Sequence, residues 1–93
     1  MLNAVKENVI ESLLVRRVSE LGGIALKVNT PSRRGFFDRL LVLPGGRIVF
    51  CEVKRPRGGR MAAHQIVYAK MLAQLGAEVA LIRNEEDIAR LLS

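Results

Sequence analysis

The stretch from Phe36 to Lys54 constrains the fold more than any other part of the chain. Two runs rich in strand-forming residues, Phe36 to Leu43 and Arg47 to Lys54, are separated only by the turn at Pro44-Gly45-Gly46. Val, Ile and Phe are enriched in strands, and a short glycine-containing connection between two such runs is typical of a hairpin. The sequence therefore predicts an antiparallel β-hairpin at the centre of the chain.

Helices and two further strands are predicted on either side of this hairpin. The spacing of apolar residues predicts helices over 2–21 and 62–75, strands over 24–29 and 77–83, and a last helix capped by Asn84. The order is α-β-β-β-α-β-α, and its β-α-β crossover favours a mixed sheet flanked by helices. The 93 residues are enough for one domain, 1–93, of the α/β class.

Composition excludes several classes of protein. Apolar residues make up 49% of the chain, so it is not of the disordered type, and its single cysteine, Cys51, excludes a disulfide scaffold. No apolar run approaches the roughly 20 residues of a membrane span, and the first residues lack the layout of a signal peptide. These features favour a reducing, cytoplasm-like compartment.

Positive charge is concentrated in the middle of the chain. The segment from Arg33 to Arg60 holds eight Lys or Arg and only two acids, so it supplies the whole net charge of +6. Arginine pairs with phosphate in a bidentate manner, which favours a polyanion as the partner. A solvated basic face without a partner is the alternative interpretation, and an acidic membrane surface fits less well because the run is not an amphipathic helix.

The two acids within this basic segment are the candidate chemical site. Side chains alternate along a strand, so Glu52 and Lys54 share one face, while Cys51 faces the other way as a small buried hydrophobe. Asp38, on the neighbouring strand of the hairpin, is expected near Glu52, and Gln65 of the next helix can reach the same end of the sheet. Two adjacent carboxylates repel unless a cation lies between them, and their hard oxygens suit Mg²⁺. An ordinary surface ion pair is the alternative for Glu52 and Lys54.

These residues resemble the G-x-x-D…E-x-K…Q pattern of the PD-(D/E)xK nucleases, and the small stand-alone VRR-NUC branch of phage and bacteria most of all. The resemblance covers nearly the whole chain and includes Glu11 and Gln65, and one departure is Phe37 where members often have Pro. It implies a restriction-endonuclease-like αβββαβ core with a short C-terminal helix. It also implies a Mg²⁺-dependent DNA endonuclease, with Mn²⁺ as a substitute and no organic cofactor.

The resemblance also implies a role for each matching position. Asp38 and Glu52 would bind the metal together with the backbone carbonyl of Val53, and Glu11 would complete the metal environment from the first helix. Lys54 would steady the attacking water or the transition state, and Gln65 would orient Lys54 or a water. The expected DNA contacts come from Lys27, Arg33, Arg34, Arg55, Arg57 and Arg60.

Branched DNA, such as four-way (Holliday) junctions or flaps of repair and recombination, is the substrate that the resemblance implies. It further implies a homodimer with two active sites, in the cytoplasm of a bacterial or phage-infected cell. Two alternatives remain from the residues themselves: a non-catalytic basic DNA-binding module, and a small protein-interaction domain whose charge is incidental.

Overall fold

A computed structural model describes residues 6–28 and 37–93 of the chain. Three helices accompany a four-stranded sheet in the order α1 (Glu7–Glu20), β1 (Ile24–Lys27), β2 (Arg39–Leu43), β3 (Arg47–Val53), α2 (Ala63–Gln74), β4 (Glu78–Ile82) and α3 (Glu85–Leu92). The predicted order of elements and the α/β class are confirmed. None of the helices in these two described ranges is long and apolar enough to cross a membrane.

The sheet is mixed, as the crossover predicted. Its strands lie in the order β1-β2-β3-β4; the pairs β1–β2 and β2–β3 are antiparallel, and the pair β3–β4 is parallel. The tight connection between β2 and β3 is a single 3-10 turn, Pro44–Gly46. Gly45 and Gly46 both have φ near +80°, a conformation that other residues rarely adopt, which explains two consecutive glycines at this point.

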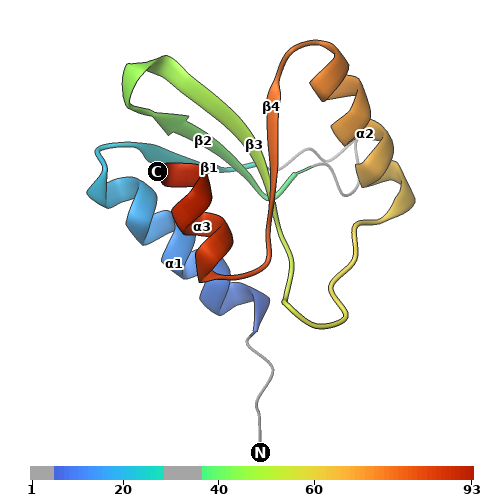
Figure 1. The fold of residues 1–93 in the computed structure, drawn as a ribbon, viewed down its shortest axis with the longest axis horizontal. Helices are drawn as coiled ribbons and strands as arrows, with labels where there is room; N and C mark the ends of the chain where they lie inside the picture. Colours follow the sequence, from blue (N-terminus) through green and yellow to red (C-terminus); the bar gives the residue numbers. More distant parts are fainter. Residues whose placement is uncertain (1–5, 29–36) are drawn as a thin grey trace, which may run out of the picture.

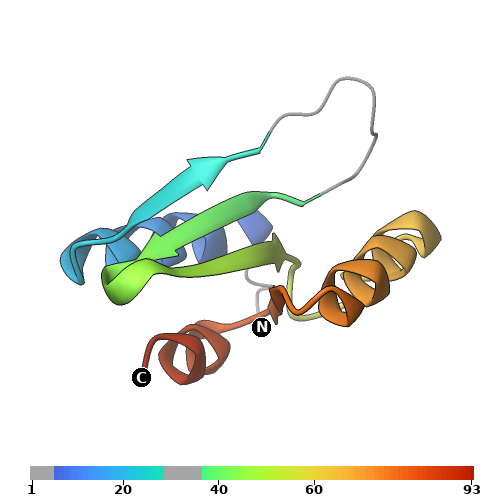
Figure 2. The same ribbon diagram turned by 90° about the horizontal axis from the view of Figure 1, so that it is seen from above.

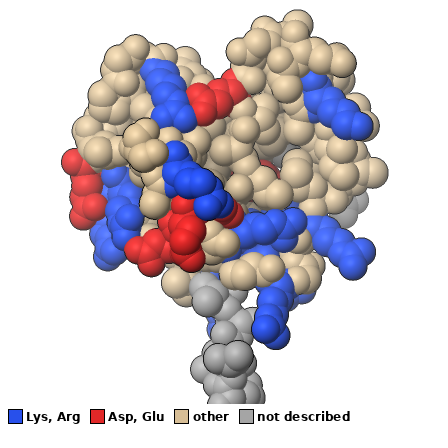
Figure 3. Space-filling view, in the orientation of Figure 1, with Lys and Arg blue, Asp and Glu red and all other residues tan. Residues whose placement is uncertain are grey.

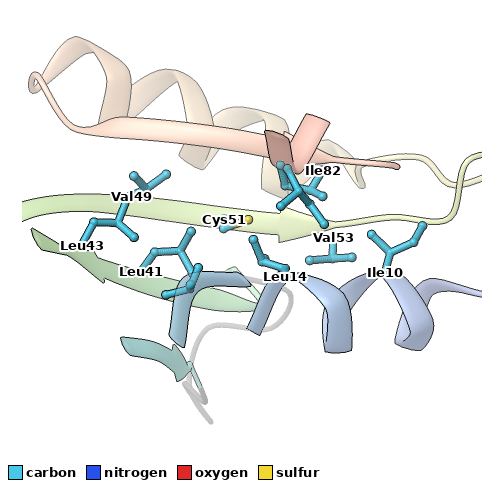
Figure 4. Close-up of a cluster of buried hydrophobic side chains, with 10 residues drawn as sticks. Ile10, Leu14, Leu41, Leu43, Val49, Cys51, Val53 and Ile82 are labelled. Carbon is cyan, nitrogen blue, oxygen red and sulfur yellow. The ribbon is translucent and has the colours of Figure 1, made fainter. Parts of the chain in front are cut away.

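One face of the sheet is covered by α1 and α3, which also contact each other. Leu14 of α1 packs with Leu41, Cys51 and Val53, and all four are fully buried (Figure 4). The second helix, α2, contacts β4 and lies on the other side of that strand from α1 and α3 (Figures 1 and 2). Two different environments therefore flank β3: an apolar core on one face and the surface beside α2 on the other.

Several predicted boundaries change. The first helix begins at Glu7 rather than Leu2, because Lys6 has an extended backbone; residues 1–5 lie outside the described part. The second strand begins at Arg39, while Phe36, where it was predicted to begin, lies outside the described residues. The Asp38 amide, just before this strand, donates to the Glu52 carboxylate. Asp38 thus precedes its strand, and this placement brings it to the end of β3.

Candidate active site

Glu52 is the centre of the candidate site. It lies one residue before the end of β3, and its side chain faces away from the core into which Cys51 and Val53 point. Although charged, Glu52 is only 1% exposed. A carboxylate this well buried must be matched by hydrogen-bond donors or cations, because an unpaired buried charge is costly.

Asp38 is joined to Glu52 through the backbone. The Val53 amide donates to Asp38 Oδ2 at 2.8 Å, and the Asp38 amide donates to Glu52 Oε1 at 3.2 Å. Each acid is therefore held by the main chain of the segment that carries the other. This reciprocal arrangement fixes two carboxylates at the point where β2 begins and β3 ends.

Lys54 and Gln65 complete the surroundings of Glu52. Lys54 Nζ lies 2.9 Å from Glu52 Oε2, and Gln65 Nε2 donates to the same oxygen at 2.5 Å. The other end of the Gln65 amide is also occupied, because Oε1 accepts the Ala62 amide at 2.9 Å. Gln65 thus caps the first turn of α2 by accepting the Ala62 amide, and it also donates a hydrogen bond to the Glu52 carboxylate.

These contacts have opposing effects on protonation. Burial, followed by the negative charge of Asp38, raises the pKa of Glu52 above its ordinary value, although Lys54 and Gln65 act in the other direction. Partial burial acts to lower the pKa of Lys54, but the hydrogen bond and charge of Glu52, with Glu7 and Asp38, outweigh it, and the pKa is raised. The lysine therefore remains charged, while the acidic pair has a surplus of negative charge that a further cation would relieve.

The donor chemistry of this site fits a hard divalent ion. Asp38 and Glu52 contribute carboxylate oxygens, the ligands that Mg²⁺ prefers, and Mg²⁺ is commonly bound through one or two carboxylates with water and phosphate. Within residues 6–28 and 37–93, no group of three or more His, Cys, Asp or Glu side chains could hold a metal. The protein thus offers a two-carboxylate site, not a closed cage of side chains.

Glu11 has a different partner. Its Oε2 accepts from Arg39 Nε at 2.7 Å, and Arg39 also donates to the carbonyl of Ala25. Arg39 directly follows Asp38, so Glu11 lies close to the site but is engaged by a cation of its own. Glu11, Arg39 and Lys27 line a separate cavity of about 570 Å³ between α1 and the β1 edge.

Phe37, which occupies the position before Asp38 where the resemblance favours Pro, is part of the apolar packing. Its side chain is buried, and its ring lies 5.9 Å from that of Phe50 at an angle of 57°. This tilted ring pair joins the segment that leads into β2 to the middle of β3. Packing of the Phe37 side chain therefore fixes the position of the backbone directly before Asp38.

The predicted basic residues fall into three groups. Arg55, Arg57 and Arg60 are exposed on the loop between β3 and α2, next to Lys54, whereas Lys27 is exposed at the end of β1. Arg33 and Arg34 lie outside the described residues. At the lower right of Figure 3, blue side chains gather where Figure 1 shows the β3–α2 loop.

Two contacts near the site were missed by sequence reasoning. Arg39 holds Glu11, and Arg83, at the end of β4, donates through Nη1 to the carbonyl of Gly59 at 2.5 Å. Arg39 could have been noticed as the residue that follows Asp38. Arg83 had no such signal, because its partner is 24 positions away and becomes a neighbour only through the β-α-β crossover.

Comparison with known proteins identifies the family. No protein-family model matches the chain. A curated protein named "Putative nuclease p44", from Acyrthosiphon pisum secondary endosymbiont phage 1, is 37% identical over 91 residues, which are 98% of this chain and 96% of that protein. A solved structure described as "VRR_NUC domain" superposes with a TM-score of 0.88 at 29% identity and covers 96% of both chains. The chain belongs to the VRR-NUC family.

Membership confirms the resemblance and the fold expected from the sequence. The match over nearly the full length also relates the chain to a phage protein that is named as a nuclease. In this VRR-NUC chain, four of the predicted site residues come together, namely Asp38, Glu52, Lys54 and Gln65, whereas Glu11 is paired with Arg39. The metal ligands and the catalytic roles of these residues remain predictions.

Proposed function

We propose that this VRR-NUC protein is a divalent-metal-dependent endonuclease that hydrolyses phosphodiester bonds in branched DNA, such as four-way junctions or flaps. The observation that carries the proposal is the reciprocal link between Asp38 and Glu52, with Lys54 Nζ 2.9 Å from Glu52. A carboxylate pair, in which Glu52 is buried and Asp38 partly buried, lies beside a charged lysine and so combines a place for a metal with a fixed positive charge. Those are the two features that hydrolysis of a phosphate diester requires.

The carboxylates of Asp38 and Glu52 and the carbonyl of Val53 would hold the ion, Mg²⁺ or in its place Mn²⁺. When bound, the ion would supply positive charge to the phosphate and favour the hydroxide form of an attacking water. Lys54 places a second positive charge at the same edge of the sheet, where it stabilises the negative charge that develops on the phosphate. Gln65 orients Glu52 and limits its movement, which is the usual contribution of a second layer of contacts around a metal site.

Glu11 has a conditional place in this proposal. Its carboxylate is held by Arg39 at 2.7 Å, and both side chains are about one-fifth exposed. Glu11 would join the metal environment only by exchanging Arg39 for the ion or for a water bound near it. Arg39 would then be free to contact the DNA backbone.

A homodimer is the proposed assembly. Besides the family resemblance, the sheet face opposite the core supports it, because Ile24 and Ile48 flank Val42 across three strands and are each at least half exposed. Further exposed apolar side chains lie on β1, on α2 and directly after α2, namely Leu26, Ile66, Val67, Met71 and Leu75. An apolar surface of this kind marks an interaction site more often than free surface.

Cleavage of labelled four-way junctions, flaps and linear duplex, each with Mg²⁺, Mn²⁺ or EDTA, tests the activity. We expect metal-dependent cutting of the branched substrates, and its loss in Asp38→Asn and Glu52→Gln. Glu86→Gln is the matched control, because Glu86 is an exposed acid in the first turn of α3. If the Asp38 and Glu52 variants cut as fast as the parent, the proposed site is wrong. Binding without any metal-dependent cutting would identify the non-catalytic alternative.

The mass in solution tests the assembly. A dimer should have twice the 10.3 kDa of the chain, and Ile48→Lys should return it to the single-chain mass. Val9→Lys is the control, since Val9 is an equally exposed apolar residue on α1 and not on the sheet face. A parent protein of single-chain mass at micromolar concentration would contradict the dimer.

A further inference from the structure

A second cavity lies directly beside the candidate active site. It has a volume of about 390 Å³ and is lined by Lys54 and by two arginines of the following loop, Arg55 and Arg60. Lys6, which immediately precedes α1, closes it from a distant part of the chain. Lys54 therefore belongs both to this cavity and to the surroundings of Glu52. We call this cavity the basic cup.

The basic cup has a surplus of positive charge. Four cations line it against one acid, Glu7, and only Lys54 among the four forms an ion pair within the part of the chain that the structure describes. Like charges gathered in a concave surface repel one another and produce a positive potential in the space between them. An anion in the cup would relieve that repulsion, and phosphate is the anion that suits both lysine and arginine.

The loop that forms the cup is folded tightly back on its own start. A Cβ atom added to Gly59 would lie 2.5 Å from the carbonyl oxygen and 2.9 Å from the amide nitrogen of Arg55. Such distances are too short for any side chain, so only glycine lets the loop approach the end of β3 this closely. The close approach keeps the cup next to Lys54.

Arg83 secures this folded loop from the far side of the crossover. Its Nη1 donates to the carbonyl of Gly59 at 2.5 Å, while its own backbone amide donates to Asp87 Oδ2 at 2.9 Å. Arg83 thus connects the loop to the junction of β4 and α3, two elements of the core. The shape of the cup is therefore set before any ligand binds.

We propose that the basic cup is a subsite for a phosphate of the DNA backbone other than the one that is cut, and that Arg83 is the positioning residue that keeps it formed. The inference rests on the proposed function, because it takes DNA as the substrate. Since Lys54 lines both places, a strand whose scissile phosphate faces Asp38 and Glu52 would present a neighbouring phosphate to the cup. Lys6 would then contact DNA although it lies outside the basic segment of the sequence.

The test measures binding without turnover. A fluorescent duplex without terminal phosphates is titrated in EDTA over a range of salt concentrations, so that only backbone phosphodiesters are available. The plot of log K against log salt has a negative slope, and each phosphate contact increases the magnitude of that slope by about 0.9. We expect Lys6→Ala to decrease the magnitude of the slope by about that amount. Lys70→Ala should leave the slope unchanged, because Lys70 is an exposed lysine of α2 outside the cup. Equal slopes for the parent and Lys6→Ala would overturn the subsite.

The role of Arg83 is tested with a second set of variants. Arg83→Ala should weaken binding about three- to tenfold, because the side chains of the loop must then be ordered when DNA binds. Arg83→Lys keeps a donor for Gly59 and should restore most of the affinity, whereas a merely general loss of stability would not be rescued in this way. Arg90→Ala is the control, since Arg90 is an exposed arginine of α3 whose ion pair, among the residues that the structure describes, is with Asp87.

The outcomes separate this inference from the proposed function. Unchanged affinity in Arg83→Ala, with the fold intact by thermal melting, would overturn the positioning role. If the cup variants bind like the parent while the parent still cuts DNA, the subsite fails and the nuclease stands. If the cup variants lose affinity but Asp38 and Glu52 prove dispensable for cutting, the catalytic proposal fails and the subsite stands.

Discussion

Gln65 offers the sharpest test of how the site is built, because one side chain makes two bonds. Its Nε2 donates to the buried Glu52 and its Oε1 accepts the Ala62 amide at the start of α2. A hydrogen bond to a charged group contributes about 1.5–3 kcal/mol, and a helix-capping bond about 0.5–2 kcal/mol. We therefore expect Gln65→Ala to lower the free energy of unfolding by about 2–5 kcal/mol.

This loss is large enough to measure in a domain of this size. One kcal/mol corresponds to about 4–8 °C in Tm for a 60–100-residue domain, so the midpoint should fall by at least about 8 °C. Cleavage should fall about 10–100-fold at a temperature where the variant is folded, as is usual when a group that orients a metal ligand is removed. Calorimetry or circular dichroism gives the first value, and a cleavage assay with Mg²⁺ gives the second.

Two further variants make this prediction falsifiable. Gln74→Ala is the same substitution on an exposed position of α2, and it should change stability by no more than about 0.5 kcal/mol. Gln65→Glu keeps an acceptor for the Ala62 amide but loses the donor to Glu52, so it should retain part of the stability and lose the activity. If Gln65→Ala and Gln74→Ala have the same Tm, the bond between Gln65 and Glu52 does not stabilise the fold.

Three further predictions concern other parts of the molecule. Asn84 Oδ1 caps α3 by accepting the amide of Asp87 at 2.8 Å, so Asn84→Ala should cost about 1 kcal/mol, or about 4–8 °C in Tm, while the exposed Asn8→Ala should not. Burial, then the charges of nearby acids, raises the pKa of the Cys51 thiol to about 12, so a thiol reagent at neutral pH should label it only on unfolding, and rapid labelling of the native protein would contradict its burial. Burial raises the pKa of Glu52, so the folded chain favours the protonated carboxyl. The contribution of this carboxyl to folding stability is fully present below the glutamate pKa of the unfolded chain, and it is lost as pH rises through the higher pKa of the folded chain. Mg²⁺ should therefore raise Tm more at about pH 8 than at about pH 5, and an equal gain at both would count against Glu52 as a ligand.

Features that repeat over short distances were determined by the sequence alone. Alternation along β3 placed Glu52 and Lys54 on one face and Cys51 in the core, and each of these positions is confirmed. The 3.6-residue spacing likewise predicted α1, with Ile10, Leu14 and Val18 buried along one side. These patterns are legible because the backbone geometry of a strand or a helix fixes the direction of successive side chains.

The contacts that make the site were decided only by the tertiary structure. Asp38 lies before its strand, not within it, and reaches Val53 because the register of β2 on β3 brings the two segments together. Glu11 pairs with Arg39, and Arg83 holds Gly59, for the same kind of reason. Such contacts join residues 15 to 28 positions apart. No local periodicity encodes them, because they depend on how strands pair and how a crossover returns to the sheet.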